Sequence, residues 1–373
     1  MSMRNKFAVL LFAGLAAAWA QPAQRSVKVN FPADSPVAVV SADWGESRES
    51  ARGSALVLDL HTALSLRNSS PRRVRGITLM VRAQAVTPGG KASVTVPSLD
   101  VRPGETFPVR IDLRLLRPQG GAGPLVEIEL DGVLFDDLSF FGANRLNSRR
   151  LMSVWELEAR RDRRHYKSIL EARGLEGLQQ EILGALARVA DHPRLDVQVS
   201  RRGRATAVRE QERQFAFLQL PDSPLEPVSG AARVAGSEAW DPRIEVLNRS
   251  SRPIRYFEIG WILRDREGRE FLAGSVPAAD TGLNLAPGQK SQVLNDATLK
   301  FSRAPGQPLA IEGMTGFVSQ AEFADGQIWI PDRAALSDPR LRRVLPPSAE
   351  EQRLADLYRK KGLPALIEEL KKF

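Results

Sequence analysis

The sequence predicts a mainly β fold with additional α-helices, built as a tandem duplicated unit in which each antiparallel β-sandwich is followed by a helical hairpin. Three observations predict this architecture. Apolar residues alternate with polar ones in several short segments, apolar residues recur at steps of three and four residues in others, and similar blocks of sequence return in the same order in both halves of the chain.

The first element is an export signal. A basic start precedes an apolar run from Phe7 to Ala18, and the small-residue site Ala18-Trp19-Ala20 ends it. The run has 12 residues. A helix needs about 20 residues to cross a bilayer. We therefore expect residues 1–20 to be a cleaved signal peptide, and the product to be a soluble protein of the periplasm or the extracellular space.

Composition limits the kinds of protein that the chain can be. It contains no cysteine, so it forms no disulfides, and each exported domain must be stabilised by a core of its own. The net charge of +9 is compatible with binding to acidic lipid, polysaccharide or nucleic acid. An Arg-rich surface without such a ligand explains the same charge, and we favour this second explanation.

An internal repeat divides the chain. The longest repeated block pairs eight residues with eight others at a constant shift of 184: Leu99, Pro103, Gly104, Val109, Leu115, Pro124, Leu125 and Gly132 with Leu283, Pro287, Gly288, Val293, Leu299, Pro308, Leu309 and Gly316. Shorter blocks lie in the same order at shifts of 180 to 188 residues, and they begin at Asp34, Asn68 and Gly174 in the first copy and at Asp222, Asn248 and Gly362 in the second. Their collinear order predicts two copies of one unit.

The repeat sets the predicted domains. In chain order these are residues 1–20 (signal peptide), 25–143 (first β-sandwich), 150–190 (first helical hairpin), 191–212 (linker), 213–333 (second β-sandwich) and 348–373 (C-terminal helical hairpin). The lengths of the two copies differ where turn residues predict loops, as expected when copies of one fold diverge.

The first part of each unit is predicted to be β-structure. Alternation at period two predicts a strand with one buried face, formed by Ile77, Leu79 and Val81 in the first copy and by Phe257, Ile259, Trp261 and Leu263 in the second. Asn-Ser turns precede these strands and Pro-Gly turns follow them. Asp325-Gly326, between two apolar pairs, predicts a tight hairpin.

These turns carry a resemblance to a known class of domain. The Leu99 to Gly104 and Leu283 to Gly288 segments, each downstream of an Asn-Ser turn, resemble the small immunoglobulin-like modules of bacterial envelope proteins. The resemblance covers only the β parts, roughly residues 56–141 and 244–330. It implies an immunoglobulin-like sandwich with an interaction role rather than a reaction, and it places Trp261 as a buried core residue.

The second part of each unit is predicted to be helical. Apolar residues at helical spacing form one face of the first pair: Tyr166, Ile169, Leu170, Leu175, Leu178, Ile182 and Leu186. Gly174 and Gly362 are expected to separate the two helices of each pair in the left-handed conformation. Ser348 and Glu351 predict a capping box at the start of the last pair. We expect the apolar faces to be covered within the chain, since exposure of such a face is costly.

No combination of residues in the sequence indicates catalysis. His61, His165 and His192 have no second His or Cys at metal-ligand spacing, and phosphate-binding loops, serine-nucleophile elbows and zinc-protease motifs are absent from the sequence. We therefore predict a protein that is not an enzyme, without cofactor, metal site or small-molecule substrate. A hydrolase with a cleft between the two units is the weakest hypothesis, because it needs convergent carboxylates that no pattern indicates.

One charged segment, residues 145–173, supports a functional hypothesis. Basic side chains one helical turn apart predict a ridge opposite the apolar face, and the candidate contacts to an anion or partner are Arg160, Arg161, Arg163, Arg164 and Lys167. Acidic residues between them also fit a solvated helix with internal ion pairs, which we favour.

Two functional hypotheses follow from these patterns. The leading one is an exported, non-catalytic interaction or scaffold protein of the cell envelope, which binds a protein partner through sandwich edges, loops or helix faces. The alternative is a binder of an anionic polymer or membrane surface through the Arg-rich helix 145–173.

Overall fold

The structure is a computed structural model, and it describes residues 27–84, 88–120, 123–191, 195–201, 211–278, 282–294, 297–303, 307–308 and 310–373. The expected signal peptide, residues 1–20, lies outside the described residues. Two compact units are present: unit 1 holds the chain up to Ser70, Thr78–Val94 and Gly104–Leu130, and unit 2 holds Pro71–Ile77, Thr95–Pro103 and Asp131–Phe373. As the sequence predicts, the fold is mainly β with few helices.

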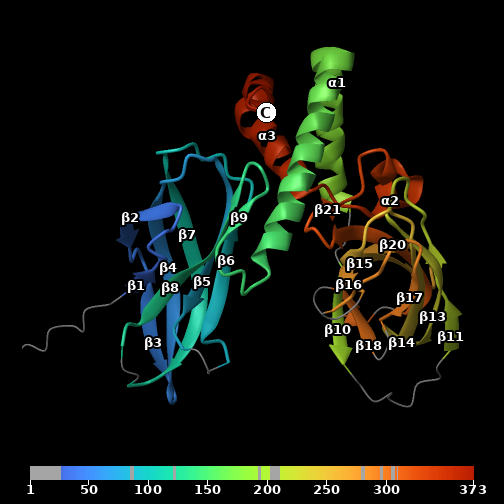
Figure 1. Ribbon diagram of the computed structural model, residues 1–373, viewed down its shortest axis with the longest axis horizontal. Coiled ribbons are helices and arrows are strands. Elements are labelled where there is room, and N and C mark those ends of the chain that lie inside the picture. Colours follow the sequence, from blue (N-terminus) through green and yellow to red (C-terminus); the bar gives the residue numbers. More distant parts are fainter. Residues whose placement is uncertain are drawn as a thin grey trace, which may run out of the picture. The chain divides into compact units, whose positions relative to one another are not determined.

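The first β-region, residues 27–141, contains two sheets (Figure 1). Its strands are β1 (Val27–Asn30), β2 (Val37–Asp43), β3 (Arg48–Arg52), β4 (Ala55–Asn68), β5 (Val74–Arg82), β6 (Lys91–Val96), β7 (Thr106–Pro118), β8 (Val126–Phe135) and β9 (Phe140–Phe141). One sheet has the order β1-β8-β5-β6, with β9 on β8. In the other, β2 and β3 pair with successive parts of β4, and β7 pairs with β4 along its length. Alternate residues of β4, such as Leu64 and Leu66, are fully buried, which is the pattern the sequence predicts for a strand with one buried face.

The second β-region, residues 211–329, also contains two sheets. Its strands are β11 (Gln211–Gln214), β12 (Ala216–Phe217), β13 (Leu225–Ala235), β14 (Glu238–Asn248), β15 (Ile254–Asp265), β16 (Glu270–Pro277), β17 (Lys290–Val293), β18 (Ala297–Arg303), β19 (Gln307–Pro308), β20 (Ile311–Phe323) and β21 (Ile328–Trp329). One sheet has the order β11-β13-β14-β18-β10, in which β10 (Leu195–Arg201) comes from the preceding segment, and the other has the order β12-β20-β15-β16. The predicted Asp325-Gly326 hairpin is confirmed, because β20 and β21 pair across it and Gly326 has a φ of 85°.

Strand β15 is buried on two faces rather than the one that alternation predicts. Trp261 is fully buried in the main core of the region, and its ring lies edge-on to Phe215 with 5.0 Å between centroids. On the opposite face, Ile262 packs in a second apolar cluster with Leu341 and Val344. Both of these belong to the short helix α2 (Pro339–Val344), which covers this face; a helix of six residues gives too short a periodic pattern to be predicted.

The part of the chain predicted to be a linker, residues 191–212, is only partly a linker. Leu195–Arg201 forms β10, which pairs antiparallel with β18 through seven residues. Leu195, Val197 and Val199 alternate with polar residues there, so the segment has a strand pattern. The strand was not predicted because turn-forming residues flank it in the sequence and because its partner strand lies about a hundred positions later in the chain.

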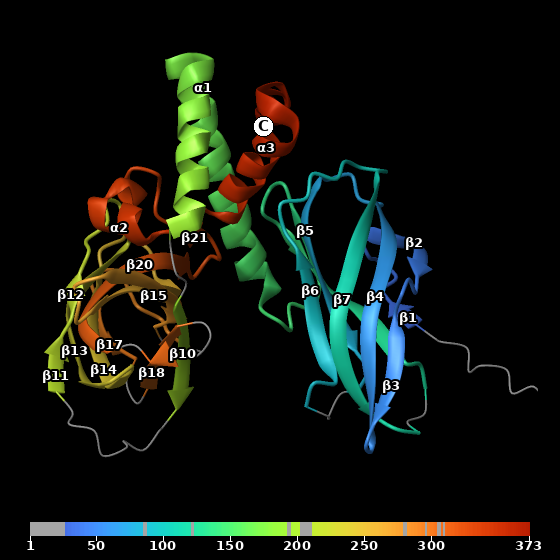
Figure 2. The same ribbon diagram turned by 180° about the vertical axis from the view of Figure 1, so that it is seen from behind.

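Two glycine-interrupted helices pack on each other (Figure 2). Helix α1 (Ser148–Asp191) is broken at Gly174, and α3 (Ala349–Leu370) is broken at Gly362, each with the positive φ that the sequence predicts. The capping box of Ser348 and Glu351 is confirmed. Both helices bury residues in one cluster: Tyr166, Leu178, Ile182, Leu354, Ala355, Leu366 and Leu370. The apolar face of each helical pair is thus covered by the other pair, except at Leu175, which is 53% exposed.

Equivalent hydrogen bonds recur in the two β-regions at the shifts seen in the sequence. The N–H of Asn68 donates to Glu105 O, and that of Asn248 donates to Gln289 O. The Asn68 carboxamide oxygen accepts the N–H and hydroxyl of Ser70, as the Asn248 oxygen accepts those of Ser250. Two further pairs repeat: Val74 N–H to Val101 O with Ile254 N–H to Leu285 O, and Gly104 N–H to Asn68 O with Gly288 N–H to Asn248 O. Each β-region also contains a short strand that pairs in parallel, β1 with β8 and β12 with β20.

Candidate functional site

Among the described strands of the first β-region, β7 is the longest strand at the edge of a sheet. Among the described strands β7 pairs with β4 alone, and the thirteen pairs run without a bulge from Arg67↔Thr106 to Ala55↔Pro118. Because Pro108 has no N–H, its place in this ladder requires a nitrogen that faces away from β4. Leu116, an even number of residues further along, donates its N–H away from β4, to Gly89 O at 2.9 Å.

The free donors of this edge follow from that geometry. Residues two apart on a strand direct their N–H groups to the same side. The N–H groups of Arg110, Asp112 and Arg114 therefore face the uncovered edge, and no other described strand pairs there. The Arg110 and Asp112 side chains are exposed. The stretch presents an extended backbone that can accept another strand.

The corresponding edge of the second β-region is covered. β17 and β18 hold the residues that the sequence shift of 184 pairs with β7. The register agrees at β17, since Leu64↔Val109 recurs as Ile244↔Val293, and it is shifted by one residue at β18, where Ala239 pairs with Leu299. Strand β10 lies on the outer side of β18, which has β14 on its other side (Figure 1). β10 also approaches the second sheet, where Val197 lies beside Gly274 of β16. This edge has thus received an added strand from the same chain.

The five basic residues that the sequence singles out do not form one exposed ridge. Arg163 is only 4% exposed, and Arg161 is 12% exposed. Arg160 reaches Glu156 at 2.8 Å, and its side chain also donates to the Asp136 carbonyl. Arg164 and Lys167 are exposed.

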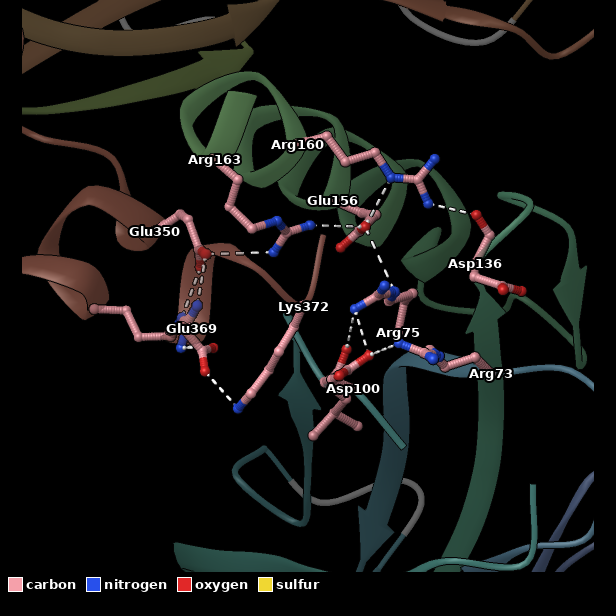
Figure 3. Close-up of polar contacts among 12 residues, drawn as sticks. Arg73, Arg75, Asp100, Asp136, Glu156, Arg160, Arg163, Glu350, Glu369 and Lys372 are labelled. Atoms are coloured by element: carbon pink, nitrogen blue, oxygen red, sulfur yellow. Dashed lines mark hydrogen bonds and ion pairs between the residues drawn. The ribbon is translucent and has the colours of Figure 1, made fainter. Parts of the chain in front are cut away.

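A buried ion-pair network in unit 2 explains the burial of Arg163 (Figure 3). Glu156, 1% exposed, accepts from Arg160 and Arg163 and lies 3.7 Å from Arg75. Arg163 also lies 3.3 Å from Glu350 at the start of α3, and its guanidinium stacks 4.0 Å above the Phe373 ring. Buried charges are tolerated when each has a partner, so the network couples α1 to α3.

The same network reaches the start of β5. Arg75, whose side chain is 9% exposed, pairs with Asp100 at 2.9 Å, and Arg73 pairs with the same carboxylate at 2.8 Å. Burial lowers the pKa of Arg75, while Glu156 and Asp100 oppose that shift. Nearby, Gly76 leaves room for Met152 of α1, since a Cβ at Gly76 would come within 2.8 Å of the Met152 sulfur. This glycine is required by close packing rather than by backbone conformation.

A second charged cluster surrounds Asp162 of α1. Asp162 is fully buried and accepts from Arg161 at 3.0 Å and from the Ser348 hydroxyl at 2.6 Å. Arg333 pairs with Glu351 at 2.6 Å and with Asp162 at 3.4 Å. Burial raises the pKa of Glu351, but the hydrogen bond and charge of Arg333 outweigh it, so the pKa lies below its usual value. The lowered pKa keeps the Glu351 carboxylate ionised at neutral pH, and this carboxylate holds Arg333 in place.

A cavity of about 700 Å³ opens beside this cluster, within unit 2. Its lining comes from both halves of α1, from β16 and β20, and from residues 331–351. The lining includes apolar side chains, which we call the apolar wall: Leu272, Phe317, Leu336 and Leu345. It also includes charged and titratable side chains, most of them from α1, which we call the charged wall: Arg161, His165, Arg173, Glu181, Arg188, Arg333, Arg342 and Glu351. Sequence reasoning missed this site because its walls lie far apart in the chain.

Two carboxylates of the cavity have perturbed pKa values. The hydrogen bond from His165, 3.2 Å away, lowers the pKa of Glu181 to about 2. Burial raises the pKa of Glu158, and the charge of Arg161 only partly opposes this. Perturbed groups in a cavity are typical of functional sites, although ion-pair networks perturb pKa values as well.

The described histidines take part in ordinary contacts. His61 lies on β4 with its Nδ1 3.0 Å from Asp112, and His165 bonds Glu181 from α1. His192 lies outside the described residues. Within the described ranges, no group of three or more His, Asp or Glu side chains is arranged to hold a metal ion.

Comparison with known proteins yields little likeness. No protein-family model matches the chain, and no curated protein matches it. Among solved structures, red sea bream transglutaminase aligns at 9% identity with a TM-score of 0.13, over 76% of this chain. The chain spans 31% of the length of that structure. A likeness at this level supports no statement about fold or activity.

Proposed function

We propose that this chain is an exported, non-catalytic interaction or scaffold protein of the cell envelope, which binds an extended segment of a protein partner along β7. The proposed architecture is a tandem duplicated unit of an immunoglobulin-like sandwich followed by a helix pair. The repeated sequence blocks and the equivalent Asn68 and Asn248 hydrogen bonds support the duplication. The presence of two sheets in each β-region, which in the second share one hydrophobic core, supports the sandwich.

One observation carries the binding mode. In the second β-region the edge formed by β18 accepts β10, an added antiparallel strand of seven residues. In the first β-region the related edge keeps the N–H groups of Arg110, Asp112 and Arg114 uncovered by any described strand. Addition of a strand supplies main-chain hydrogen bonds for affinity, and side-chain pockets add specificity. A partner segment on β7 would repeat what β10 does on β18.

Export is supported by the first residues of the sequence. Residues 1–20 have the basic, apolar and small-residue parts of a secretory signal. Helices of the described ranges include none with the length and apolar character that spanning a bilayer requires. The absence of cysteine fits an envelope protein stabilised by its core and its ion pairs alone.

The binding mode is tested by photo-cross-linking in intact cells from a photoreactive residue at position 112. A discrete protein adduct is expected. Arg110→Pro should abolish the adduct, because it removes an outward N–H donor without removing a bond to β4. Arg110→Gln is the matched control, because it changes the side chain and keeps the backbone donor. An absent adduct, or one that survives Arg110→Pro, would contradict strand addition.

The alternative, binding of an anionic polymer or membrane surface, has one observation in its favour. Arg164 and Lys167 are exposed and lie about one turn apart on α1. Retention on a heparin matrix that falls steeply with salt, and falls further in Arg164→Gln/Lys167→Gln, is its expected signature. Buried Arg163 is not available for such contact, so retention independent of Arg164 and Lys167 would eliminate this helix as the binding surface.

A further inference from the structure

The cavity beside α1 has the size and the two-sided character of a ligand site. Its volume of about 700 Å³ lies inside the range of about 300–1,000 Å³ that is typical of small-molecule pockets. We propose that it binds a single-chain amphiphile with an anionic headgroup, whose apolar body contacts the sheet side and whose headgroup contacts arginine side chains. This site is distinct from the β7 edge, so the proposal does not depend on strand addition.

The apolar wall is built by three separate elements. Leu272 lies on β16 and Phe317 on β20, while Leu336 and Leu345 flank α2. Phe317 is 4% exposed and belongs to the cluster that α2 covers. Leu272, Leu336 and Leu345 are half-buried and pack against the same cluster. Packing of this kind restricts the side chains before a ligand enters, which lowers the entropic cost of binding.

The charged wall has an excess of cations. Five arginines and three glutamates line the cavity. Asp162 pairs with Arg161 and Arg333, and including it brings the number of acidic side chains at the site to four. One positive charge remains even with His165 neutral, so the site favours an anion over a cation of the same shape.

Some of the arginine donors are not used by the protein. Arg342 is exposed, lines the cavity, and makes no ion pair or side-chain hydrogen bond within the described ranges. Arg188 uses one nitrogen, which donates to Glu351 at 3.0 Å. A guanidinium carries five N–H donors in a planar fork that matches a carboxylate or phosphate group. The two side chains can therefore contact an anionic headgroup without losing their present partners.

The ionic cluster fixes the position of this wall. Arg333 is held by Glu351 and Asp162, and Arg188 is held by Glu351. Tyr166, which is fully buried, donates its hydroxyl to the same Glu351 carboxylate at 3.3 Å. Binding groups held by packing and by hydrogen bonds of this kind are preorganised for a ligand.

The test is calorimetric titration of the full chain with decanoate and decyl phosphate, with decanol and decyltrimethylammonium as neutral and cationic controls. Saturable one-site binding of an anionic probe, with no binding of the two controls, is expected. Binding of all four probes alike, or of none at millimolar concentration, would overturn the proposal.

Three variants locate the site. Arg342→Gln should weaken binding of the anionic probe by about tenfold, since it removes one charge-assisted contact. Arg343→Gln is the matched control on the same helix, because Arg343 pairs with Glu270 and does not line the cavity. Ser319→Trp should fill the cavity and abolish binding. Unchanged affinity in Arg342→Gln and in a folded Ser319→Trp protein would place any binding elsewhere and refute this site.

Discussion

Strand β7 of the first β-region and strands β17–β18 of the second lie at corresponding positions in the sequence, but they differ in whether another strand covers their outer edge. β17 pairs with β14 in the register of β7 on β4, and β18 pairs with β14 one residue out of that register. Among the described strands, β18 carries an added strand and β7 does not. Natural proteins protect open edges with short strands, charges and prolines. β3 has such protection, with five exposed residues that include Arg48 and Arg52. β7 is longer, with thirteen residues; its two prolines, Pro108 and Pro118, lie near its ends, and the stretch between them carries Arg110, Asp112 and Arg114. We propose that the uncovered length between the prolines accepts a partner segment.

The largest expected effect on stability comes from substitutions in one buried strand of each β-region, β5 and β15. Val81 and Trp261 correspond at the sequence shift of 180, and both are fully buried. Trp261→Ala is expected to cost about 3–5 kcal/mol of unfolding free energy, because it leaves a large cavity beside Phe215. Val81→Ala should cost about 2 kcal/mol, since two methyl groups are lost. Urea denaturation of both variants measures this, and equal losses would show that the two cores are not organised as described.

The next largest expected effect is on stability, at Arg75 and Arg255, which correspond at the sequence shift of 180. Arg75 is 9% exposed within the Glu156 and Asp100 network, whereas Arg255 is 43% exposed and pairs with Glu322. Arg75→Ala should cost about 3 kcal/mol, because it leaves buried carboxylates without one of their partners. Arg255→Ala should cost about 1 kcal/mol or less, because Arg255 is itself largely exposed and buried Glu322 keeps Arg149 and Arg150 as partners. Thermal unfolding provides the measurement, and a larger loss for Arg255→Ala would contradict the network.

A smaller effect concerns the added strand itself. Val197 of β10 packs against the core, and Val199 on the same strand is 44% exposed. Val197→Asp is expected to cost about 2 kcal/mol, because it places an unpaired charge against apolar side chains. Val199→Asp should change stability by less than about 0.5 kcal/mol. If the two variants behave alike in chemical denaturation, β10 is not anchored through Val197.

The smallest expected effect is on the pH dependence of the free energy of unfolding. It is tested at Glu181 and Glu369, which correspond at the sequence shift of 188. The His165 hydrogen bond lowers the pKa of Glu181 to about 2 from an ordinary value of 4.5. A lowered pKa in the folded state stabilises the protein above the unfolded value, and this stability is lost as pH falls from 4.5 toward 2. Glu181→Gln should therefore flatten the stability curve over that window.

Glu369 gives the comparison for this effect. Burial raises its pKa, but Lys372 and Arg353 outweigh burial and lower it overall. Glu369→Gln should also flatten the acid part of the curve. Arg164→Gln, which alters an exposed cation, is the control and should leave the curve unchanged. A curve as steep in Glu181→Gln as in the parent protein would mean that Glu181 and His165 do not interact in solution.

Structural features that depend on neighbouring residues could be predicted from the sequence, whereas contacts between residues far apart in the chain could not. The breaks at Gly174 and Gly362, the capping box at Ser348 and the Asp325-Gly326 hairpin depend on neighbouring residues, and each is present. Arg163 lies on the polar side of a helical pattern, so its burial depends on Glu350 of a helix almost two hundred residues later. No periodicity within α1 contains that information.

The candidate sites follow the same rule. The cavity needs Phe317, Arg342 and Arg188 to meet, and they belong to three elements that are distant in the sequence. The open edge of β7 is recognisable only when β10 is found on β18, because an edge is defined by which strand is absent beside it. Alternation identifies strands, but it does not state their neighbours.

Residue-level hydrogen exchange of β7 and β18 tests the central claim most directly. The amides of Arg110 and Asp112 should exchange rapidly while that of Val109, directed toward β4, is protected. On β18, between β10 and β14, the amides of Leu299 and Lys300 should both be slow. Equal protection of neighbouring β7 amides in the isolated protein would mean that this edge is already covered and would contradict the account.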